Sequence, residues 1–422
     1  MHLQEISHPK VGIVGGGPSG SFAALNFLKL AQEEGIFPHI LIFEPRDFDK
    51  PGPESCNRCA GILSSRLMKG LGKLDLELPP RIIQSELHSY ALHLDHEVIQ
   101  IAQPDPSRRI ASVYRGAGPR LLHGKPLAGL DGYLLTQACL QGAHHIPHRV
   151  EHITWEGKPI IQSAKEEHEV DFLILATGVN SHAPLSPRFG YQPPKTTVMA
   201  QDEILRPTSW PADRVNIYFK QPPGLKFGVI IPKDDYLNIS LLGKDMNRDS
   251  IQEFIHAQDL RDELAYSQSS SLCGCNPRIA VGPAHGYYGD RWIAVGDAAV
   301  SRLYKDGIGS AFYTAKKAVQ VALKSGISKQ AFKSQYEPYC KHIHRDNRFG
   351  KWLFSFWEFM LQEPLLLKAW TRALQAEKDQ SAKTQAHIRI VWGMFTGDEP
   401  YRDLLSLGFR PKALRNLFFP PQ

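Results

Sequence analysis

The sequence predicts an α/β protein, α+β overall, in which a Rossmann-like dinucleotide-binding domain carries an inserted antiparallel β-sheet domain and a helical C-terminal region. Three observations support this fold class. A short apolar strand at 11–14 runs into a glycine-rich turn, which is typical of the first βαβ unit of such domains. Residues 190–275 contain segments that alternate apolar and polar side chains, as antiparallel sheets do. A second apolar strand at 292–295 ends in Gly-Asp and precedes a long helical pattern.

The glycine-rich turn has the G-x-G-x-x-G spacing of a dinucleotide site. Gly15 allows the tight turn, Gly17 lets the backbone approach a pyrophosphate, and Gly20 lets the following helix lie close to the strand. That helix is expected at 19–34, and its N-terminal N–H groups would stabilise phosphate charge. A glycine-rich turn without a ligand is the alternative, and the motif alone does not distinguish FAD from NAD.

An acidic residue closes the second predicted strand, which covers 39–43. Glu44 follows this strand directly, and a carboxylate there can accept hydrogen bonds from an adenosine ribose hydroxyl. We therefore extend the predicted cofactor site to the residues around the helix start and the strand end: Pro18, Ser19, Glu44, Pro45 and Arg46.

Length and composition limit the class of protein. A chain of 422 residues accommodates two or three domains, and a net charge of +6 gives no reason to expect nucleic acid as a partner. No apolar run reaches the roughly 18 residues of a membrane span. The first ten residues are too short and polar for a signal peptide. We expect a cytoplasmic protein.

Three segments are expected to form the cofactor domain, at 1–75, 111–189 and 276–330. The substrate domain would take its strands from 76–110 and 190–275, and the helical region would cover 331–422. Within the cofactor domain we expect helices near 62–71 and 130–142 and a buried strand at 170–176.

The second Gly-Asp segment adds a further part of the predicted site. Asp297, at the end of a strand, can hydrogen-bond a sugar-like hydroxyl. The helix expected at 306–324 opens with Gly307, Ile308 and Gly309, and its free N–H groups could face a flat, electron-rich ring. The alternative interpretation is a capped helix after a strand, with no ligand.

Taken together, these motifs resemble FAD-dependent oxidoreductases of the p-hydroxybenzoate hydroxylase superfamily. The resemblance rests on the glycine turn, Glu44, Ala176-Thr177-Gly178 and Gly296-Asp297-Ala298-Ala299. Within the superfamily, the chain is most similar to the geranylgeranyl reductase family. Three further segments carry this closer resemblance: Pro53-x5-Cys59-x-Gly61, the helix pattern from Leu130 to Ala143, and Thr396-Gly397-Asp398-x-Pro400-Tyr401-Arg402.

The resemblance implies an enzyme that holds FAD and reduces carbon–carbon double bonds of a hydrophobic, isoprenoid or lipid-like substrate, with NAD(P)H or ferredoxin as electron donor. It places the three motif glycines on the pyrophosphate and Glu44 on the adenosine ribose. Asp297 would bind the ribityl chain and the pyrophosphate, and Gly307 to Gly309 would lie under the pyrimidine edge of the flavin. Gly178 and Gly296 belong to the same implied cofactor set, and Cys59 would lie near the ring face.

The predicted substrate sheet departs from the family pattern. Where the family usually has Y-x-W-x-F-P, this chain has Phe227-x-Val229-x-Ile231-Pro232, which we take as the substrate-binding residues. The missing Trp reshapes the pocket. A flavin monooxygenase or halogenase on the same fold is a second hypothesis, although halogenases usually show W-x-W-x-I-P and both Trp positions are replaced here. A flavoprotein electron carrier with a cysteine-based redox centre is a third.

Four cysteines fall in two closely spaced pairs. Cys56 and Cys59 are the predicted catalytic residues: Cys59 could donate a proton or form a redox disulfide with Cys56. The alternative is that Cys59 is only a small residue that packs beside the ring. Cys273 and Cys275 could join Cys56 and Cys59 in a four-thiolate zinc or iron–sulfur site. The alternative places Cys273 and Cys275 on a strand. We predict no metal ion.

The C-terminal region combines aromatic and basic residues. Its segment 352–360 is dense in Trp and Phe, and residues 331–422 hold 14 Lys and Arg against 9 Asp and Glu. Three interpretations are open. The aromatics could make a peripheral contact at the inner face of a membrane, line the mouth of an apolar substrate tunnel, or pack in a core.

Overall fold

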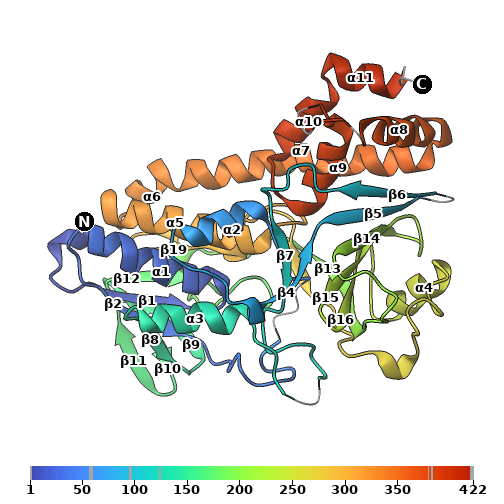
Figure 1. Ribbon diagram of the computed structural model, residues 1–422. Coiled ribbons are helices and arrows are strands. Elements are labelled where there is room, and N and C mark those ends of the chain that lie inside the picture. Colours follow the sequence, from blue (N-terminus) through green and yellow to red (C-terminus); the bar gives the residue numbers. More distant parts are fainter. Residues whose placement is uncertain are drawn as a thin grey trace.

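The computed structural model describes residues 2–56, 60–94, 97–122, 125–378, 380–381 and 384–418. Two large sheets lie at opposite ends of the chain's fold, with helices between and around them (Figure 1). The first is six-stranded, in the order β18-β19-β12-β1-β2-β8. Its strands are β1 (Lys10–Val14), β2 (His39–Phe43), β8 (His144–Ile146), β12 (Phe172–Leu175), β18 (Tyr288–Gly289) and β19 (Trp292–Ala294).

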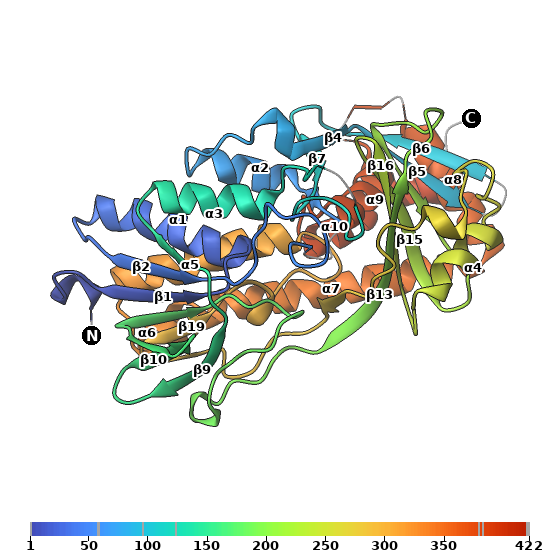
Figure 2. The same cartoon turned by 90° about the horizontal axis from the view of Figure 1, so that it is seen from below.

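The six-stranded sheet is parallel except for β18, which pairs antiparallel with β19. Both of its faces are covered, so its central strands are apolar runs and do not alternate; all four residues of β12 are buried. On one face lie α1 (Pro18–Glu33), α3 (Leu130–Leu140) and α5 (Gly307–Lys324). On the other lies a three-stranded sheet of β9 (Val150–Trp155), β10 (Pro159–Ser163) and β11 (Glu166–Glu169) (Figure 2).

The second large sheet has seven strands, in the order β17-β13-β16-β15-β14-β5-β6. These are β5 (Ser89–Leu94), β6 (Glu97–Ala102), β13 (Thr196–Leu205), β14 (Arg214–Tyr218), β15 (Leu225–Lys233), β16 (Tyr236–Gly243) and β17 (Arg278–Ala280). The expected antiparallel sheet is therefore present, but β14 pairs with β5 in parallel. Since β5 and β14 are far apart in sequence, no hairpin fixes their relative direction.

A small fourth sheet, β3-β7-β4, lies between the two large ones. It contains β3 (Ile62–Leu63), β4 (Ile83–Leu87) and β7 (Ile110–Val113). The helix expected from residue 62 therefore begins later, as α2 (Ser65–Gly72). Ile62 and Leu63 pair with β7 instead, and the Ser64 hydroxyl caps the helix by accepting the Leu67 N–H. A short helix, α4 (Asp249–Ala257), covers one face of the seven-stranded sheet.

In the described residues, the C-terminal region is formed by α6 (Lys329–Gln335), α7 (Glu337–Gln362), α8 (Pro364–Glu377), α9 (Ala386–Thr396), α10 (Tyr401–Gly408) and α11 (Pro411–Phe418). The long helix α7 runs from the six-stranded sheet to the seven-stranded sheet (Figures 1 and 2). Its inward side chains and those of α9 share one apolar core with β5, β14 and β15. Of the helices in the described ranges, none has both the length and the apolar character needed to cross a membrane.

Candidate functional site

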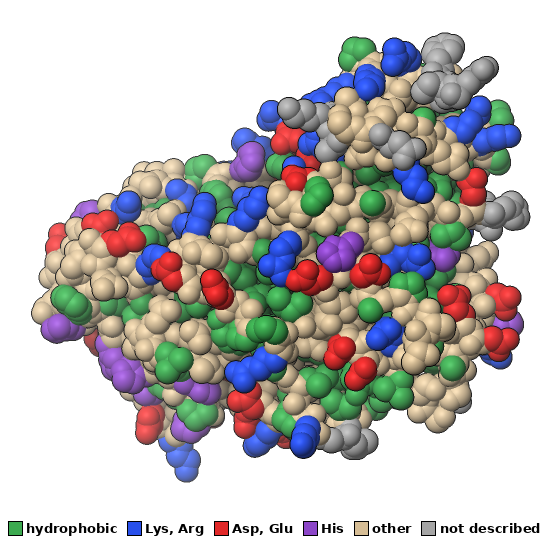
Figure 3. Space-filling view, in the orientation of Figure 1, with side chains coloured by type: hydrophobic (Ala, Val, Ile, Leu, Met, Phe, Trp, Pro, Cys, Tyr) green, Lys and Arg blue, Asp and Glu red, His purple; other side chains and the backbone are tan. Residues whose placement is uncertain are grey.

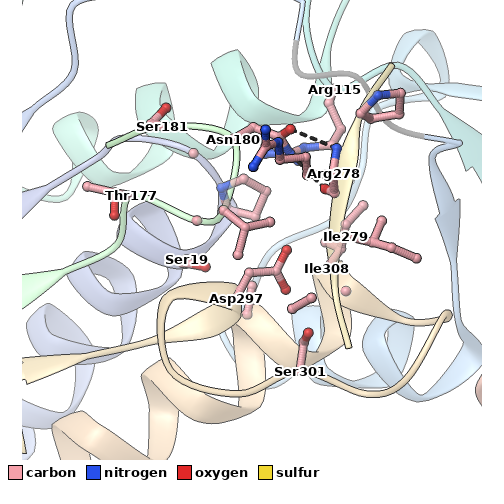
Figure 4. Close-up of a pocket in the computed structure, with 18 of the residues that line it drawn as sticks. Ser19, Arg115, Thr177, Asn180, Ser181, Arg278, Ile279, Asp297, Ser301 and Ile308 are labelled. Carbon is pink, nitrogen blue, oxygen red and sulfur yellow. Dashed lines mark hydrogen bonds between the residues drawn. The ribbon is translucent and has the colours of Figure 1, made fainter. Parts of the chain in front are cut away.

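A cavity of about 790 Å³ lies between the six-stranded and the seven-stranded sheets. One part of its lining comes from the start of α1, the end of β2 and the loops after β12 and β19. The other part comes from β13, β15, β16 and the end of α9. Figure 4 shows the middle of this cavity, where Asp297 and Ser301 lie on one side and Arg115 and Arg278 on another. The volume is within the usual range for small-molecule sites.

The glycine turn shapes one end of the cavity. Gly15 has φ of +105°, and a Cβ there would lie 2.6 Å from the carbonyl oxygen of Ala176. A Cβ on Gly20 would overlap the carbonyl oxygen of Gly15, so only glycine lets α1 approach the turn this closely. Gly17 is the N-cap of α1, and no backbone atom of the described residues outside its own chain neighbours lies within 4 Å of where its Cβ would be. The helix N-terminus therefore opens into the cavity.

Arg115 adds a positive charge next to this helix N-terminus. Its guanidinium makes two hydrogen bonds to Asp131, from Nε to Oδ1 at 3.0 Å and from Nη2 to Oδ2 at 2.8 Å. Asp131 is fully buried; burial raises the pKa of its carboxyl, against the opposing effect of Arg115. A bidentate pair holds a guanidinium in one orientation. The helix start and Arg115 together form a site for an anion such as a pyrophosphate.

The end of β2 positions Glu44 beside the same turn. Glu44 is buried and accepts hydrogen bonds from the Gly16 N–H at 3.0 Å and from the Arg46 guanidinium at 2.8 and 2.9 Å. Burial alone would raise the pKa of the Glu44 carboxyl, but the Arg46 and Gly16 interactions lower it overall. The carboxylate is thus kept ionised as an acceptor at the cavity edge.

Two of the polar residues that line the cavity are Asp297 and Thr177. Burial raises the pKa of the Asp297 carboxyl, while a hydrogen bond from Ser301 and the charge of Arg115 act in the opposite direction. Thr177, in the loop after β12, has a buried hydroxyl oxygen for which the described residues provide no hydrogen-bond partner. The Asp297 carboxylate keeps acceptor capacity beyond the hydrogen bond from Ser301, so it is suited to the hydroxyls of a bound ligand. Buried polar groups are normally paired, so the Thr177 hydroxyl is a second candidate.

The start of α5 forms the next part of the lining. Asp306 precedes the helix in a left-handed conformation, with φ of +57°, and Gly307 and Ile308 line the cavity. Burial raises the pKa of Asp306 to about 6, and the Ser64 hydroxyl donates to its Oδ1 at 2.9 Å. The helix N-terminus therefore presents its first N–H groups beside Asp297.

The far end of the cavity is apolar. Phe227 and Val229 of β15, Leu242 of β16 and Phe395 of α9 line it. The Phe227 and Phe395 rings meet edge to face with their centroids 5.4 Å apart. An elongated ligand bound along the glycine turn would therefore end against an aromatic and aliphatic wall.

Most of the predicted site residues line this one cavity, although they come from distant parts of the chain. Those that do are Gly15, Gly17, Pro18, Ser19, Glu44, Pro45, Arg46, Cys56, Gly178, Phe227, Val229, Asp297, Gly307 and Ile308. Those in the described ranges that do not are Gly20, Ile231, Pro232, Gly296 and Gly309. Cys59, the other predicted catalytic residue, lies outside the described residues.

The predicted residues outside the lining have identifiable packing environments. A Cβ on Gly296 would overlap Ser19 of α1, and one on Gly309 would overlap the Asp306 carboxylate, so both glycines permit close packing. Ile231 is fully buried in the apolar core, and the Pro232 carbonyl accepts a hydrogen bond from the Ser112 hydroxyl. The cavity-facing part of β15 therefore ends before Ile231, because the strand continues past the cavity towards β7.

The fold brings three of the four paired cysteines together. The Cys273 thiol lies within hydrogen-bonding reach of the Cys275 and Cys56 thiols, and Cys56 also lines the cavity. The interactions with Cys275 and Glu203, together with burial, raise the pKa of Cys273 well above its usual value. In the described part of the chain, no three His, Cys, Asp or Glu residues are arranged to hold a metal ion.

A buried ion pair lies behind the cysteines. Lys233 Nζ is 2.9 Å from Glu203 Oε1, and both side chains are almost fully buried. Asn238 Nδ2 donates to the same oxygen at 3.1 Å, and the Cys273 thiol donates to Oε2 at 3.6 Å. The Lys233 ammonium also lies 4.3 Å from the centre of the Tyr114 ring. Each charge of this pair therefore has several partners.

Several residues of the cavity lining were not predicted from the sequence, among them Arg115, Thr396, Phe395 and Lys305. Arg115 could have been suspected from Asp131, since an acid in the first turn of a buried helix often has a basic partner. No signal in the sequence pointed to Lys305 or Phe395, because neither belongs to a spaced motif.

No protein-family model matches this sequence, and neither does any curated protein. Solved structures match it over nearly its whole length. A geranylgeranyl bacteriochlorophyll reductase-like protein from Thermoplasma acidophilum gives a TM-score of 0.64 at 18% identity and covers 98% of this chain and 100% of its own. A flavin-dependent brominase gives 0.62 at 15% identity, with coverages of 94% and 98%. A variant of HpxO from Klebsiella pneumoniae, solved with FAD, gives 0.59 at 15% identity, with coverages of 95% and 100%.

At such low identities the likeness concerns the fold alone. It extends over both sheets and the C-terminal helices, since almost the entire chain is covered in each comparison. The chain therefore has the mixed α/β fold of flavoproteins with a Rossmann-like FAD-binding domain.

Proposed function

We propose that this protein is an FAD-dependent oxidoreductase that reduces a carbon–carbon double bond of a hydrophobic substrate. One observation carries the proposal: a continuous cavity joins an anion-binding helix start to an apolar wall. A dinucleotide bound along the first part would bring its reactive end to the second. The reductase-like protein among the structural neighbours supports the same assignment.

The residues that line the cavity fit FAD. The start of α1 and Arg115 would hold the pyrophosphate, and Glu44 would accept from the adenosine ribose. Asp297 and the Thr177 hydroxyl would bind ribityl hydroxyls, and the N-terminus of α5 would lie beside the ring. When bound and reduced, FAD supplies a hydride equivalent.

The protein's own contribution at the reacting end is orientation and exclusion of water. Phe227, Val229, Leu242 and Phe395 offer apolar surface to an alkene, and a dry site strengthens the electrostatic interactions within it. A small residue at position 229, where the similar family usually has Trp, leaves more room for a branched chain. The electron donor that we propose is NAD(P)H or ferredoxin.

Two alternative functions are each supported by a different observation. The brominase among the structural neighbours favours a monooxygenase or halogenase on the same fold. The contact between Cys56 and Cys273 at the cavity favours an electron carrier that passes electrons through thiols. The raised pKa of Cys273 argues against the second alternative, because the thiolate is the reactive form.

An anaerobic reoxidation experiment tests the proposed function. The FAD-loaded protein is reduced with dithionite and mixed with geranylgeraniol, with the corresponding α,β-unsaturated aldehyde geranylgeranial, or with buffer alone. We expect at least one of the two alkenes to reoxidise the flavin at least about tenfold faster than buffer, and its product to gain two hydrogen atoms by mass spectrometry. If neither alkene reoxidises the flavin anaerobically, and a hydroxylated or halogenated product forms once oxygen and bromide are admitted, the monooxygenase or halogenase is favoured. Parallel titrations with NADH, NADPH and reduced ferredoxin identify the donor.

We also propose a peripheral membrane contact through one face of α7. Lys341, Arg345 and Arg348 are exposed at helical spacing on this face. Trp352, Phe356 and Phe359 continue the same face and are 61%, 49% and 51% exposed. We call these six residues the α7 stripe. Other Lys and Arg side chains gather over the neighbouring C-terminal helices in Figure 3. A basic and aromatic face of this kind suits the surface of an anionic bilayer.

Vesicle cosedimentation tests the α7 stripe. We expect binding to phosphatidylglycerol vesicles and little binding to phosphatidylcholine vesicles, with binding weakened by salt. Replacing Trp352, Phe356 and Phe359 by Ser should reduce binding about tenfold or more. The matched control replaces three apolar residues that are exposed elsewhere, Phe37, Leu140 and Leu205, by Ser. Equal losses in both variants, or equal binding to both lipids, would refute the contact.

A further inference from the structure

The cavity contains a lysine that the proposed function has not used. Lys305 lies in the loop between β19 and α5 and lines the cavity at its apolar end. Its ammonium nitrogen is 5.1 Å from the centre of the Phe227 ring and 5.5 Å from that of Phe395. The described residues give this ammonium no hydrogen bond and no acidic partner. A positive charge therefore faces the space where the substrate would bind.

A partly buried ammonium without an acidic partner in the described residues is an unfavourable arrangement. Burial disfavours the charged form and lowers the pKa of Lys305 to about 8. The two aromatic faces offset part of this penalty through cation–π attraction. Lys233 is a contrasting lysine in the same protein. Its ammonium is paired with Glu203, and Asn238 donates a hydrogen bond to the same carboxylate. Lys305 has no such acidic partner in the described residues, so its charge can interact with a bound ligand.

We propose that Lys305 binds the carbonyl or carboxylate oxygen of the substrate, so that the reduced double bond is one conjugated to that oxygen. This inference rests on the proposed function and narrows its substrate class to hydrophobic α,β-unsaturated carbonyl compounds. The apolar wall of Phe227, Val229 and Phe395 would hold the chain of such a molecule, and Lys305 would hold its polar end.

The reaction balances with the groups named. A hydride adds to the β carbon, and the electron pair of the double bond moves towards the carbonyl oxygen, giving an enolate. The Lys305 ammonium stabilises that negative charge, which is absent from the substrate before reaction. One proton then reaches the α carbon, and the substrate has gained two hydrogen atoms in total. An ammonium whose pKa is lowered to about 8 can supply that proton and regain it from solvent.

The titratable neighbours of Lys305 do not neutralise it. Arg302 is 3.8 Å from the centre of the Tyr401 ring and also pairs with Asp346. Lys226 of β15 pairs with Glu358 of α7. The remaining titratable groups on the loop and across the cavity are Tyr304, Asp306 and Asp297.

Binding of a stable oxyanion tests the inference without turnover. Dodecanoate mimics the enolate charge on an apolar chain, and dodecan-1-ol is the uncharged control. Both are titrated into the FAD-loaded protein by calorimetry at pH 6.5 and pH 9.5. We expect Lys305→Met to weaken dodecanoate about tenfold or more at pH 6.5 and to leave dodecan-1-ol unchanged. Wild-type affinity for dodecanoate should be full below pH 8 and fall above it, because the ammonium that binds it loses its proton.

Lys226→Met is the matched control. It removes another lysine beside an aromatic ring, 5.9 Å from the centre of Tyr304, whose ring contacts that of Phe227. This lysine already has Glu358 as a partner. We expect it to leave dodecanoate affinity unchanged. Lys305→Met should also raise the melting temperature of the ligand-free protein, since it removes an enclosed charge.

Two results would overturn the inference. Unchanged dodecanoate affinity in Lys305→Met would show that the ammonium does not meet the ligand. If Lys305→Met leaves dodecanoate affinity unchanged but lowers the reduction potential of the flavin, the Lys305 ammonium stabilises the reduced cofactor and not the substrate. A failure of the proposed function would look different. If dodecanoate binding depends on Lys305 but no unsaturated compound reoxidises the reduced flavin, Lys305 binds anions but the protein is not a reductase of double bonds.

Discussion

Asp297→Ala is expected to leave the folded protein with little or no bound FAD. Asp297 faces the middle of the cavity, and its carboxylate is the charged acceptor proposed for ribityl hydroxyls. Loss of a charged hydrogen bond costs about 1.5–3 kcal/mol, which corresponds to roughly 10- to 150-fold weaker binding. The ratio of flavin to protein absorbance after purification, followed by a fluorescence titration with FAD, measures the effect.

Two controls separate this effect from unfolding. Asp235→Ala removes an exposed acid from the β15–β16 turn and should leave FAD affinity unchanged. Asp297→Asn keeps one acceptor oxygen and should give an intermediate affinity. Because burial raises the pKa of Asp297, the alanine variant without flavin should melt no lower than the wild-type protein without flavin. Full flavin occupancy in Asp297→Ala would remove the main support for the cofactor's position.

Lys233→Met is expected to lower the free energy of unfolding by about 3–5 kcal/mol, because it leaves Glu203 buried without its cation. Asn238 and the Cys273 thiol would remain as donors to Glu203, but neither carries a positive charge. The double variant Lys233→Met/Glu203→Gln should recover part of the loss, since it also removes the negative charge. Urea unfolding at pH 7 measures all three proteins.

The matched control is again Lys226→Met. Its pair with Glu358 is more exposed, with side-chain exposures of 23% and 36%, so its loss should cost no more than about 1 kcal/mol. A similarly small loss for Lys233→Met would contradict the prediction.

Local signals explain why much of the site could be predicted from the sequence. The glycine turn requires conformations and close approaches that only glycine allows, as Gly15 and Gly20 show. Glu44 and Asp297 each follow a buried strand, and the ends of neighbouring parallel strands meet at one edge of a sheet. These residues therefore converge as a consequence of the βαβ topology. Their predicted roles towards FAD remain proposals.

The pattern of apolar residues predicted which segments are buried better than it predicted which elements they pair or pack with. The alternation in β13 to β16 predicted strands, but it did not reveal that β14 pairs in parallel with β5. The aromatic segment at 352–360 proved to have two faces. Phe354 and Trp357 pack in the core, with the Phe354 ring 5.8 Å from that of Phe227, whereas Trp352, Phe356 and Phe359 are exposed. Helical phase decides this division, and a count of aromatics does not.

The sequence by itself determined the fold class, the cofactor-type turn and the residues at the strand ends, because short-range backbone geometry specifies them. Only the tertiary structure decided that Arg115 lies over the helix start, that Cys56 meets Cys273, and that Lys305 faces Phe227 and Phe395 without an acidic partner among the described residues. Each of these contacts joins segments from different elements. Whether a charged side chain is paired or left available depends on the packing of those elements, which no local pattern encodes.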